Sequence, residues 1–346
     1  MQERVVAVVG ATGAVGREML RVLEERRFPV RELRAFASSR SVGSTVTFAG
    51  QPVTVRGLDP QAFDGVDVAL FSAGAERARD WAPVAARAGA VVVDNSSAFR
   101  MHPDAPLVVP EVNPEMLAAH RGIIANPNCS TIQMVVALRP LRQLFGLRRI
   151  VVSTYQSVSG TGARAIQELD RTSRQFMAGE PETREVYPRP IAFDVLPQVA
   201  DFDAFGHTTE ENKMRDETRK IFGDERIIVH ATCVRVPVFR SHSEAVVAET
   251  ERPVDFDALR AAFRAAPGIV LRDVASEYPM AREAAGRDEV FVGRLRGTAD
   301  DPCVVSMWVV SDNLRKGAAT NAVQIAELLQ SRAAFAGKGD AWPHRS

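Results

Sequence analysis

The sequence predicts an α/β protein built as a doubly wound N-terminal domain with a parallel sheet, followed by an α+β domain with a mixed or antiparallel sheet. Three observations lead to this prediction. The length of 346 residues suggests two domains at roughly 150 residues each. Short apolar runs alternate with helical patterns over residues 1–128, as in doubly wound sheets. Longer β-rich segments dominate after that point.

The N-terminal domain is read from its apolar runs. Val5–Val9 is a continuous β-branched segment, typical of a parallel strand covered on both faces, and Ala14–Arg26 follows it with helical periodicity. A second helix is predicted over Ala75–Ala88. The other predicted strands are Leu33–Ala37, Val66–Phe71, Val91–Val93, Leu107–Val109 and Gly122–Ala125.

The second domain is predicted over residues 129–312. It opens with an amphipathic helix, Ile132–Leu144, and a strand, Arg149–Gln156, which leads into the loop Ser157–Gly162. Further strands are predicted over Ile227–Val238, Glu244–Thr250, Val290–Leu295 and Val304–Val310, with helices over Thr208–Ile221 and Phe256–Ala265. The final helix, 313–330, is assigned to the first domain, and residues 331–346 are predicted to be a poorly ordered tail.

Composition excludes several classes of protein. Hydrophobic residues make up 46% and charged residues 25% of the chain, which is typical of globular proteins and not of disordered ones. The 43 basic and 43 acidic residues cancel, so no net field attracts nucleic acid or an anionic membrane. No apolar run is long enough to span a bilayer. Three cysteines without a CxxC pair argue against a disulfide framework or a thiolate metal site and favour a reducing, cytoplasmic location.

A glycine-rich turn, Gly10-Ala11-Thr12-Gly13-Ala14-Val15-Gly16, joins the first strand to the first helix. Glycines there let backbone N–H groups approach a pyrophosphate at the helix N-terminus, although the spacing is GxxGxxG and a tight turn that binds nothing is the alternative. Beyond the second strand the chain carries Ser38, Ser39 and Arg40 where NAD sites place an acidic residue. Hydroxyls and an arginine suit a 2′-phosphate, so NADP is the predicted cofactor; a solvated loop arginine is the alternative.

Cys129 is the candidate nucleophile. It precedes the predicted helix, with Ser130 or Thr131 as expected caps, and the helix dipole there favours the thiolate. A buried, inert cysteine is the alternative. Cys233 and Cys303 lie in strand patterns and are interpreted as structural. A thiolate beside a nicotinamide suggests attack on an activated acyl group, followed by hydride reduction of the thioester to an aldehyde.

Such a reaction needs a proton carrier, and His242 is the candidate. It is predicted to lie in a loop that joins two strands, although an ordinary loop histidine would look the same. The other histidines are interpreted as surface or packing residues: His102, His120, His207, His230 and His344.

These motifs together resemble the aspartate-β-semialdehyde dehydrogenase family of the bacterial type. The matching segments span nearly the whole chain: GATGAVG (10–16), SSAFR (96–100), NPNCST (126–131), STYQSVSGTG (153–162), EENKM (210–214), RVPV and HSE (235–244), and VSDNLRKGAATNAVQIAE (310–327). The resemblance implies a Rossmann-like NADP-binding domain and a catalytic and dimerisation domain. It further implies reductive dephosphorylation of 4-phospho-L-aspartate to L-aspartate 4-semialdehyde, in lysine, methionine and threonine biosynthesis, by a homodimer.

The resemblance also implies roles for single residues. Cys129 would be the nucleophile, His242 the acid/base, and Gln156 the residue that orients the intermediate, although Gln156 is also an ordinary polar residue for a strand end. Substrate-binding roles would fall to Arg100, Asn128, Glu210, Lys213 and Arg235. Cofactor-binding roles would fall to Gly10, Thr12, Gly13, Ala14, Val15, Ser38, Ser39, Arg40, Ser159, Gly160 and Asn313, with Gly162 in the same loop as Ser159.

Alternatives remain open for several of these residues. Arg235 could be a strand arginine paired at the surface, and Glu210 with Lys213 could form an ion pair within a helix. Ser241 departs from the family pattern, because many members have glycine before the histidine. Two other functions also stay open: reduction of another acyl phosphate, such as N-acetylglutamyl phosphate, and a non-catalytic binding role.

Overall fold

The structure is a computed structural model that describes residues 2–274 and 276–331. The chain folds into two compact units, one formed by residues up to Asn128 together with those from Ala318 onward, and the other by Cys129–Gly317. The tail predicted over residues 331–346 lies outside the described residues except for Ser331, which ends the last helix.

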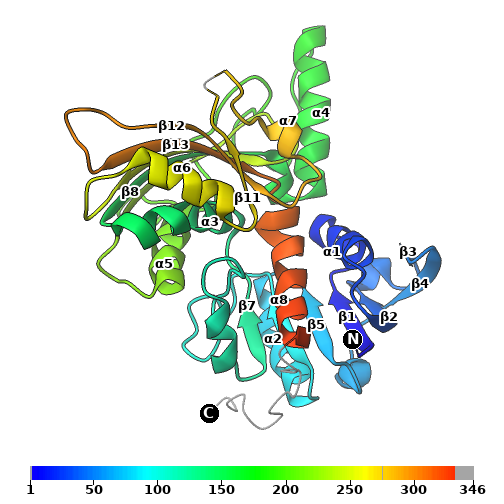
Figure 1. The fold of residues 1–346 in the computed structure, drawn as a ribbon. Helices are drawn as coiled ribbons and strands as arrows, with labels where there is room; N and C mark the ends of the chain where they lie inside the picture. Colours follow the sequence, from blue (N-terminus) through cyan, green and yellow to red (C-terminus); the bar gives the residue numbers. More distant parts are fainter. Residues whose placement is uncertain (1, 275, 332–346) are drawn as a thin grey trace. The chain divides into compact units, whose positions relative to one another are not determined.

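The first unit contains a seven-stranded sheet, ordered β3-β4-β2-β1-β5-β6-β7 (Figure 1). All pairs are parallel except β3 with β4, which is antiparallel. The strands are β1 (Arg4–Val9), β2 (Val30–Phe36), β3 (Thr45–Phe48), β4 (Gln51–Arg56), β5 (Val68–Phe71), β6 (Val91–Asp94) and β7 (Ile123–Ala125). Residues 5–9 of β1 are at most 1% exposed, as expected for a parallel strand covered on both faces.

Helices cover this sheet. α1 (Ala14–Glu25) packs against α8 (Thr320–Ser331), and both contribute to one core with alternate residues of β1, β5 and β6. α2 (Ala75–Arg87) packs against β5 and β6, with its buried alanines allowing close approach. The short 3-10 helices are η1 (Ser39–Ser41), η2 (Pro60–Phe63) and η3 (Pro114–Ala119).

Two features of the first unit differ from the sequence prediction. The hairpin β3–β4 was not predicted. The expected strand Leu107–Val109 is wrong, because only Leu107 forms an isolated bridge, to Ala125. The segment lies between Pro106 and Pro110, which have no N–H, and only the Val108 N–H donates to β7, at the Ala125 carbonyl. Amide side chains bond the other groups: the Asn113 Oδ1 accepts from the Val109 N–H, and the Asn321 Nδ2 donates to the Val108 carbonyl.

The second unit contains a six-stranded mixed sheet, ordered β11-β12-β13-β10-β8-β9. The outer pairs β11–β12 and β8–β9 are parallel and the three inner pairs are antiparallel. The strands are β8 (Arg149–Gln156), β9 (Ile228–Arg235), β10 (His242–Glu249), β11 (Ile269–Arg272), β12 (Val290–Arg296) and β13 (Val304–Ser311).

Three helices lie on one face of this sheet (Figure 1): α3 (Cys129–Phe145), α5 (Thr209–Phe222) and α6 (Phe256–Ala265). α3 packs against β10, β12 and β13, whereas α5 packs against β9. Alternation along β8 buries its residues on this face and leaves Val151 and Tyr155 exposed on the other. The unit also contains η4 (Val158–Thr161), α4 (Ala163–Ala178) and α7 (Ala281–Ala284).

Several predicted boundaries in the second unit are wrong. α3 begins at Cys129, so Ser130 and Thr131 lie inside the helix and are not its caps. His242 is the first residue of β10 and not a loop residue. Cys303 lies in the turn before β13. The predicted helix 313–330 starts later, because Asn313 precedes a π-helical turn, η5 (Arg315–Ala319), which leads into α8.

α4 and β11 were not predicted at all.

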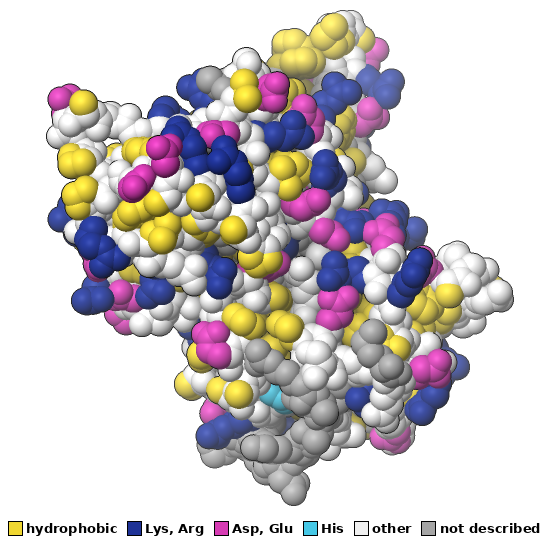
Figure 2. Space-filling model, viewed as in Figure 1, with side chains coloured by type: hydrophobic (Ala, Val, Ile, Leu, Met, Phe, Trp, Pro, Cys, Tyr) yellow, Lys and Arg dark blue, Asp and Glu magenta, His cyan; other side chains and the backbone are white. Residues whose placement is uncertain are grey.

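The surface carries charges of both signs. Figure 2 shows Lys and Arg side chains interspersed with Asp and Glu side chains on the visible face, in keeping with 43 residues of each sign in the sequence. Among the described residues, no helix is both long enough and apolar enough to cross a membrane.

Candidate active site

The candidate nucleophile and the candidate proton carrier lie together in the second unit. The Cys129 Sγ is 3.3 Å from the Nε2 of His242. Cys129 is the first residue of α3 and is partly exposed, while His242 starts β10 and is fully buried. The first turn of a helix has unpaired N–H groups and a positive dipole end, which favours the thiolate of Cys129.

The hydrogen bonds of His242 fix which ring nitrogen carries the proton. Its Nδ1 accepts from the backbone N–H of Ser157 at 3.0 Å, with the Ser157 hydroxyl at 3.2 Å. A backbone N–H can only donate, so the neutral ring carries its hydrogen on Nε2, the nitrogen that faces Cys129. The imidazole therefore presents an N–H donor to the sulfur.

The surroundings keep His242 neutral. Burial and the nearby Arg235 guanidinium lower the pKa of His242 to about 3, against a smaller opposing effect of Glu210. An imidazolium would also lose the bond from the Ser157 N–H, which the protonated Nδ1 cannot accept.

Gln156 connects α3, which carries Cys129, to α5, which carries Glu210. It ends β8, is 1% exposed, and its Nε2 donates to the Ser130 Oγ at 2.8 Å and to the Glu210 Oε1 at 3.1 Å. The Thr154 hydroxyl is 3.3 Å away. The Gln156 amide is thus held beside the first turn of α3.

Glu210 and Lys213 lie three residues apart on α5 and form the ion pair that the sequence left as an alternative, with 3.4 Å between the Lys213 Nζ and the Glu210 Oε2. Glu210 is buried, whereas the Lys213 side chain is 27% exposed. The Thr208 side chain caps α5 and forms a capping box with Glu211, which fixes where this helix begins.

Arg235 ends β9 and is not a surface strand arginine. It is 6% exposed, and its Nη1 donates to the Ser157 carbonyl at 2.7 Å. Its Nε is buried and has no hydrogen-bond partner among the described residues. A Cβ at Gly160 would lie 3.1 Å from the Arg235 Nη1 and 3.4 Å from the His242 ring, so the loop approaches both side chains closely.

Asn313 organises the loop around His242. Its Oδ1 accepts from the Ser159 hydroxyl at 3.0 Å, the Ser157 hydroxyl at 3.2 Å and the Ser241 N–H at 2.9 Å. The structure thus joins Asn313 and Ser159, which the sequence had assigned to the cofactor, in one buried network.

Two candidate substrate residues, Arg100 and Asn128, belong to the first unit, and both are 7% exposed. The Arg100 guanidinium donates to the Asn126 carbonyl at 3.0 Å and to the Asn95 carbonyl at 2.9 Å. It also opposes the burial that raises the pKa of Asp94. The Arg100 cation is thus oriented by backbone carbonyls.

The glycine-rich turn has the geometry that a phosphate-binding turn requires. Gly10 has φ +91°, a conformation that L side chains rarely adopt, and a Cβ on Gly16 would overlap the Gly10 carbonyl. Gly13 precedes α1, whose first residues are Ala14 and Val15. The turn follows β1 where the strand order reverses between β2 and β5, the usual position of a nucleotide site.

A cavity of about 240 Å³ lies beside this turn. Of the predicted cofactor residues, Gly10, Thr12, Gly13 and Ser38 line it, while Ser39 and Arg40 are exposed in η1 next to it and do not. Arg77 on α2 also lines the cavity and was missed. It is one of several arginines in a helix pattern, so the sequence carries no signal that distinguishes it.

The remaining cysteines and histidines lie elsewhere. Cys233 is fully buried in β9, and burial raises the pKa of its thiol. His207 and His230 are exposed, and His344 lies outside the described residues. His102 and His120 each accept one local backbone N–H. Within residues 2–274 and 276–331, no group of three or more His, Cys, Asp or Glu side chains is placed to hold a metal ion.

Two family models match the chain. Residues 5–120 match the semialdehyde dehydrogenase NAD binding domain, and residues 138–316 match the semialdehyde dehydrogenase dimerisation domain. The chain is 55% identical over 330 residues to an aspartate-semialdehyde dehydrogenase of Aquifex aeolicus (strain VF5), covering 94% of this chain and 97% of that protein.

Solved structures are also similar. The crystal structure of aspartate semialdehyde dehydrogenase II complexed with ASA from Vibrio cholerae matches with a TM-score of 0.93 and 50% identity, covering 96% of this chain and 99% of that one. An aspartate semialdehyde dehydrogenase with NADP from Candida albicans matches with a TM-score of 0.76 and 25% identity, over 96% and 99% of the two chains. The predicted fold class is confirmed, and the first unit is a nicotinamide-cofactor-binding domain.

Proposed function

The chain belongs to the aspartate-semialdehyde dehydrogenase family, and on that premise we propose that it catalyses the reversible, NADP-dependent reductive dephosphorylation of 4-phospho-L-aspartate to L-aspartate 4-semialdehyde. The observation that carries the proposal is the 3.3 Å contact between the Cys129 sulfur at the start of α3 and the Nε2 of a neutral His242. A thiolate next to a neutral N–H donor suits acyl transfer through a thioester.

In the proposed first step the Cys129 thiolate attacks the acyl carbon, a C–S bond forms, and the bond from that carbon to the phosphate oxygen breaks. Inorganic phosphate leaves with the electron pair. The Gln156 amide and the His242 Nε2–H are the nearby donors for the negative charge that develops on the acyl oxygen. When bound, the reduced nicotinamide supplies the hydride that converts the thioester to the aldehyde. Release of the aldehyde returns the thiolate, which the His242 N–H again stabilises.

The substrate would be held by charge. We assign the substrate carboxylate to Arg235, whose buried Nε has no partner among the described residues. The substrate ammonium would face the Glu210 carboxylate, and Lys213 would recognise the phosphate. Arg100, to which the resemblance gives the same role, and Asn128, proposed only as substrate-binding, belong to the first unit. Glu210 favours the aspartyl substrate over N-acetylglutamyl phosphate, because an acetylated amine carries no positive charge.

The preference for NADP would come from the polar groups near the turn. Ser38 lines the cavity there, Ser39 and Arg40 follow it, and Arg77 contributes a second guanidinium. An arginine suits the 2′-phosphate through two parallel hydrogen bonds, and no acidic residue lines the cavity to repel it. Of the two arginines, Arg77 is the one that lines the cavity.

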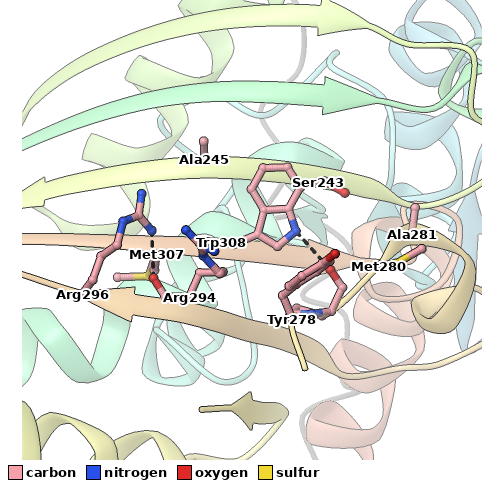
Figure 3. Close-up of a pocket in the computed structure, with 10 residues that line it drawn as sticks. Ser243, Ala245, Tyr278, Met280, Ala281, Arg294, Arg296, Met307 and Trp308 are labelled. Atoms are coloured by element: carbon pink, nitrogen blue, oxygen red, sulfur yellow. Dashed lines mark hydrogen bonds between the residues drawn. The ribbon is translucent and has the colours of Figure 1, made fainter. Parts of the chain in front are cut away.

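We further propose that the protein is a homodimer that pairs through the face of the six-stranded sheet opposite α3, α5 and α6, a face that α7 covers only in part. The exposed side chains Val151, Tyr155 and Ile228 lie on this face, and a cavity of about 470 Å³ opens beside Trp308 (Figure 3). Tyr278, Met280 and Met307 are among its lining residues. Apolar surface of this kind on a unit that matches a dimerisation domain favours a second copy of the chain as its occupant.

The test is a steady-state assay in the direction of semialdehyde oxidation, with phosphate and with NADP or NAD. We expect turnover that requires phosphate, prefers NADP and is abolished in Cys129→Ala, while Cys303→Ala, at another partly exposed cysteine, stays active. Loss of His242 should lower the rate about 10²- to 10⁴-fold. Turnover that does not need phosphate, or full activity of Cys129→Ala, would refute the thioester route.

A further inference from the structure

A fully buried carboxyl group, Glu244, takes no part in the proposed chemistry. It lies on β10 two residues after His242, so both side chains point to the face of the sheet that α3 covers. Its strand neighbours are Thr154 on β8 and Val309 on β13. Burial of an ionised carboxyl group costs free energy unless the group is paired or protonated. The presence of Glu244 two residues from His242 therefore requires an explanation.

Gln133 on α3 is the side chain that faces Glu244. It is 1% exposed, and its amide lies near enough to the Glu244 carboxyl to lower the pKa of that group. Neither the two Glu244 oxygens nor the Gln133 amide atoms have a hydrogen-bond partner among the described residues. Both groups are buried, and no polar group of the described residues satisfies their hydrogen-bonding atoms.

The Cys129–His242 pair and the Gln133–Glu244 pair are separated by similar distances along α3 and along β10. Cys129 and Gln133 are four residues apart on α3, which is about 6 Å along one helix face. His242 and Glu244 are two residues apart on β10, which is about 6.6 Å along one strand face. The Gln133–Glu244 pair thus lies one step below the Cys129–His242 pair, between the same helix and the same strand.

The environment of Glu244 favours its protonated form. Burial raises its pKa well above the usual value, the like charge of Glu210 on α5 acts in the same direction, and only the Gln133 amide opposes them. The other titratable group nearby is the Cys233 thiol on β9, whose pKa is raised chiefly by burial. A protonated carboxyl and a primary amide can exchange two hydrogen bonds, from O–H to amide oxygen and from N–H to carbonyl oxygen.

We propose that Glu244 pairs with Gln133 and so acts as a positioning residue, one that holds the helix carrying Cys129 in register with the strand carrying His242. The inference rests on the proposed function where it is tested by enzyme kinetics. It does not rest on that function where it is tested by the chemical reactivity of Cys129. Glu244 and Gln133 would act by fixing the distance between the Cys129 sulfur and the His242 Nε2. Neither of the two residues would contact the substrate.

The kinetic test compares Glu244→Gln, Glu244→Leu and Gln133→Leu with the wild type, with Val246→Ala as the control. Val246 is the next residue on the same buried face of β10 and is 1% exposed. We expect Glu244→Gln to keep kcat within about twofold, because an amide pair also exchanges two hydrogen bonds. Both leucine variants should lower kcat at least about tenfold with KM changed less than about threefold, since a positioning residue acts on the transition state. Val246→Ala should keep the wild-type kcat.

The chemical test needs no substrate and remains available if the wild type proves inactive with the semialdehyde, an outcome that would count against the proposed function alone. It measures the rate of Cys129 alkylation by iodoacetamide against pH, by peptide mass spectrometry. In Gln133→Leu the apparent pKa of Cys129 should rise, and in Glu244→Gln it should match the wild type. If Glu244→Leu does not fold, Gln133→Leu carries both tests.

Three results would overturn the proposal. Loss of activity in Glu244→Gln equal to that in the leucine variants would show that the carboxylate charge is needed. Unchanged kcat and an unchanged alkylation profile in Gln133→Leu would show that the pair positions nothing. An equal loss of kcat in Val246→Ala would reduce the effect to packing of the core.

Discussion

At the scale of single residues, the site depends on a histidine that stays neutral. Burial, the Arg235 guanidinium and the Ser157 N–H all oppose the imidazolium of His242. A substrate carboxylate bound to Arg235 would neutralise that cation and so raise the pKa of His242 on binding. The charge of the proposed substrate-binding residue and the acid strength of the proposed proton carrier are therefore coupled.

The lowered pKa of His242 predicts a specific acid sensitivity. An unfolded histidine protonates near pH 6.5, whereas the folded group does so only near pH 3. Between these values the unfolded state binds the extra proton, so stability falls as the pH falls. His242→Asn, whose Oδ1 can still accept from Ser157, should flatten the pH dependence of the unfolding free energy by about 1.4 kcal/mol per pH unit in that window. Urea denaturation at pH 6, 5 and 4 measures the difference; parallel curves for the two proteins would disprove it.

Ser241 has a strained backbone conformation that glycine would adopt without strain. This agrees with the expectation that many family members have glycine at this position. The φ of Ser241 is +76°, and its buried hydroxyl has no partner among the described residues. Ser241→Gly should therefore raise the unfolding free energy by about 1 kcal/mol, because relief of strain and of the unpaired hydroxyl exceeds the added entropy of the unfolded chain.

Thermal and urea denaturation test this, with Ser153→Gly within β8 as the matched control. That variant should lose about 0.5–1 kcal/mol, since glycine is unfavourable in a regular strand. Destabilisation of both variants by the same amount would argue against strain at Ser241.

Sequence reasoning at this scale found the residues that short motifs mark and missed those that only the fold brings together. Cys129 was identified from its position before a predicted helix and His242 from its predicted place in a loop between two strands, while Gln156 was identified from the family resemblance alone. Glu244 lies inside an HSE motif, but nothing in the sequence indicates that it faces Gln133 one step below the nucleophile. Arg77 likewise becomes notable only because α2 presents it to the cavity.

At the scale of elements, the glycine-rich turn places β1 and α1 too close together for a side chain. Gly16→Ala would put a Cβ into the Gly10 carbonyl and the Ala11 backbone. We expect an unfolding free energy lower by about 1–3 kcal/mol and NADP affinity weakened about tenfold or more, since the turn must widen. Titration by tryptophan fluorescence or calorimetry measures the affinity. Gly57→Ala, where a Cβ would lie 3.7 Å from the Val42 side chain, an ordinary contact distance, should change neither quantity, and equal effects in both variants would contradict the steric account.

Elements were predictable where a single pattern decides them. β8 and α6 have the predicted bounds, because a run rich in β-branched residues marks the strand and an apolar stripe marks the helix. α4 was missed because it is largely polar, with only Ala165, Glu168, Leu169 and Thr172 buried. It is fixed instead by tertiary contacts, since the Glu168 carboxylate accepts three backbone N–H groups from residues 185–187. The start of α3 was misplaced because the Ser130 hydroxyl accepts from Gln156 and does not cap the helix.

At the scale of the whole molecule, the apolar sheet face opposite α3, α5 and α6 predicts a dimer. Trp308→Glu, in the cavity of Figure 3, should convert the wild-type dimer to a monomer, because a charge would be buried against a second copy. Light scattering coupled to size-exclusion chromatography measures the mass. Met116→Glu, at a residue 41% exposed in the first unit, is the control and should remain a dimer. A wild-type protein that is monomeric at micromolar concentration would contradict the prediction.

The chain passes between its two units at Cys129 and again at Gly317, and a Cβ on Gly317 would lie 2.8 Å from the Cβ of Cys129.

The measurement that tests the proposed chemistry most directly is peptide mass spectrometry after mixing the protein with aspartate semialdehyde and NADP in the absence of phosphate. Without phosphate to accept the acyl group, one β-aspartyl group should accumulate on the peptide that contains Cys129, with one NADPH formed per chain in a rapid burst. An unmodified Cys129, or a group attached to Cys233 or Cys303, would contradict the proposed chemistry.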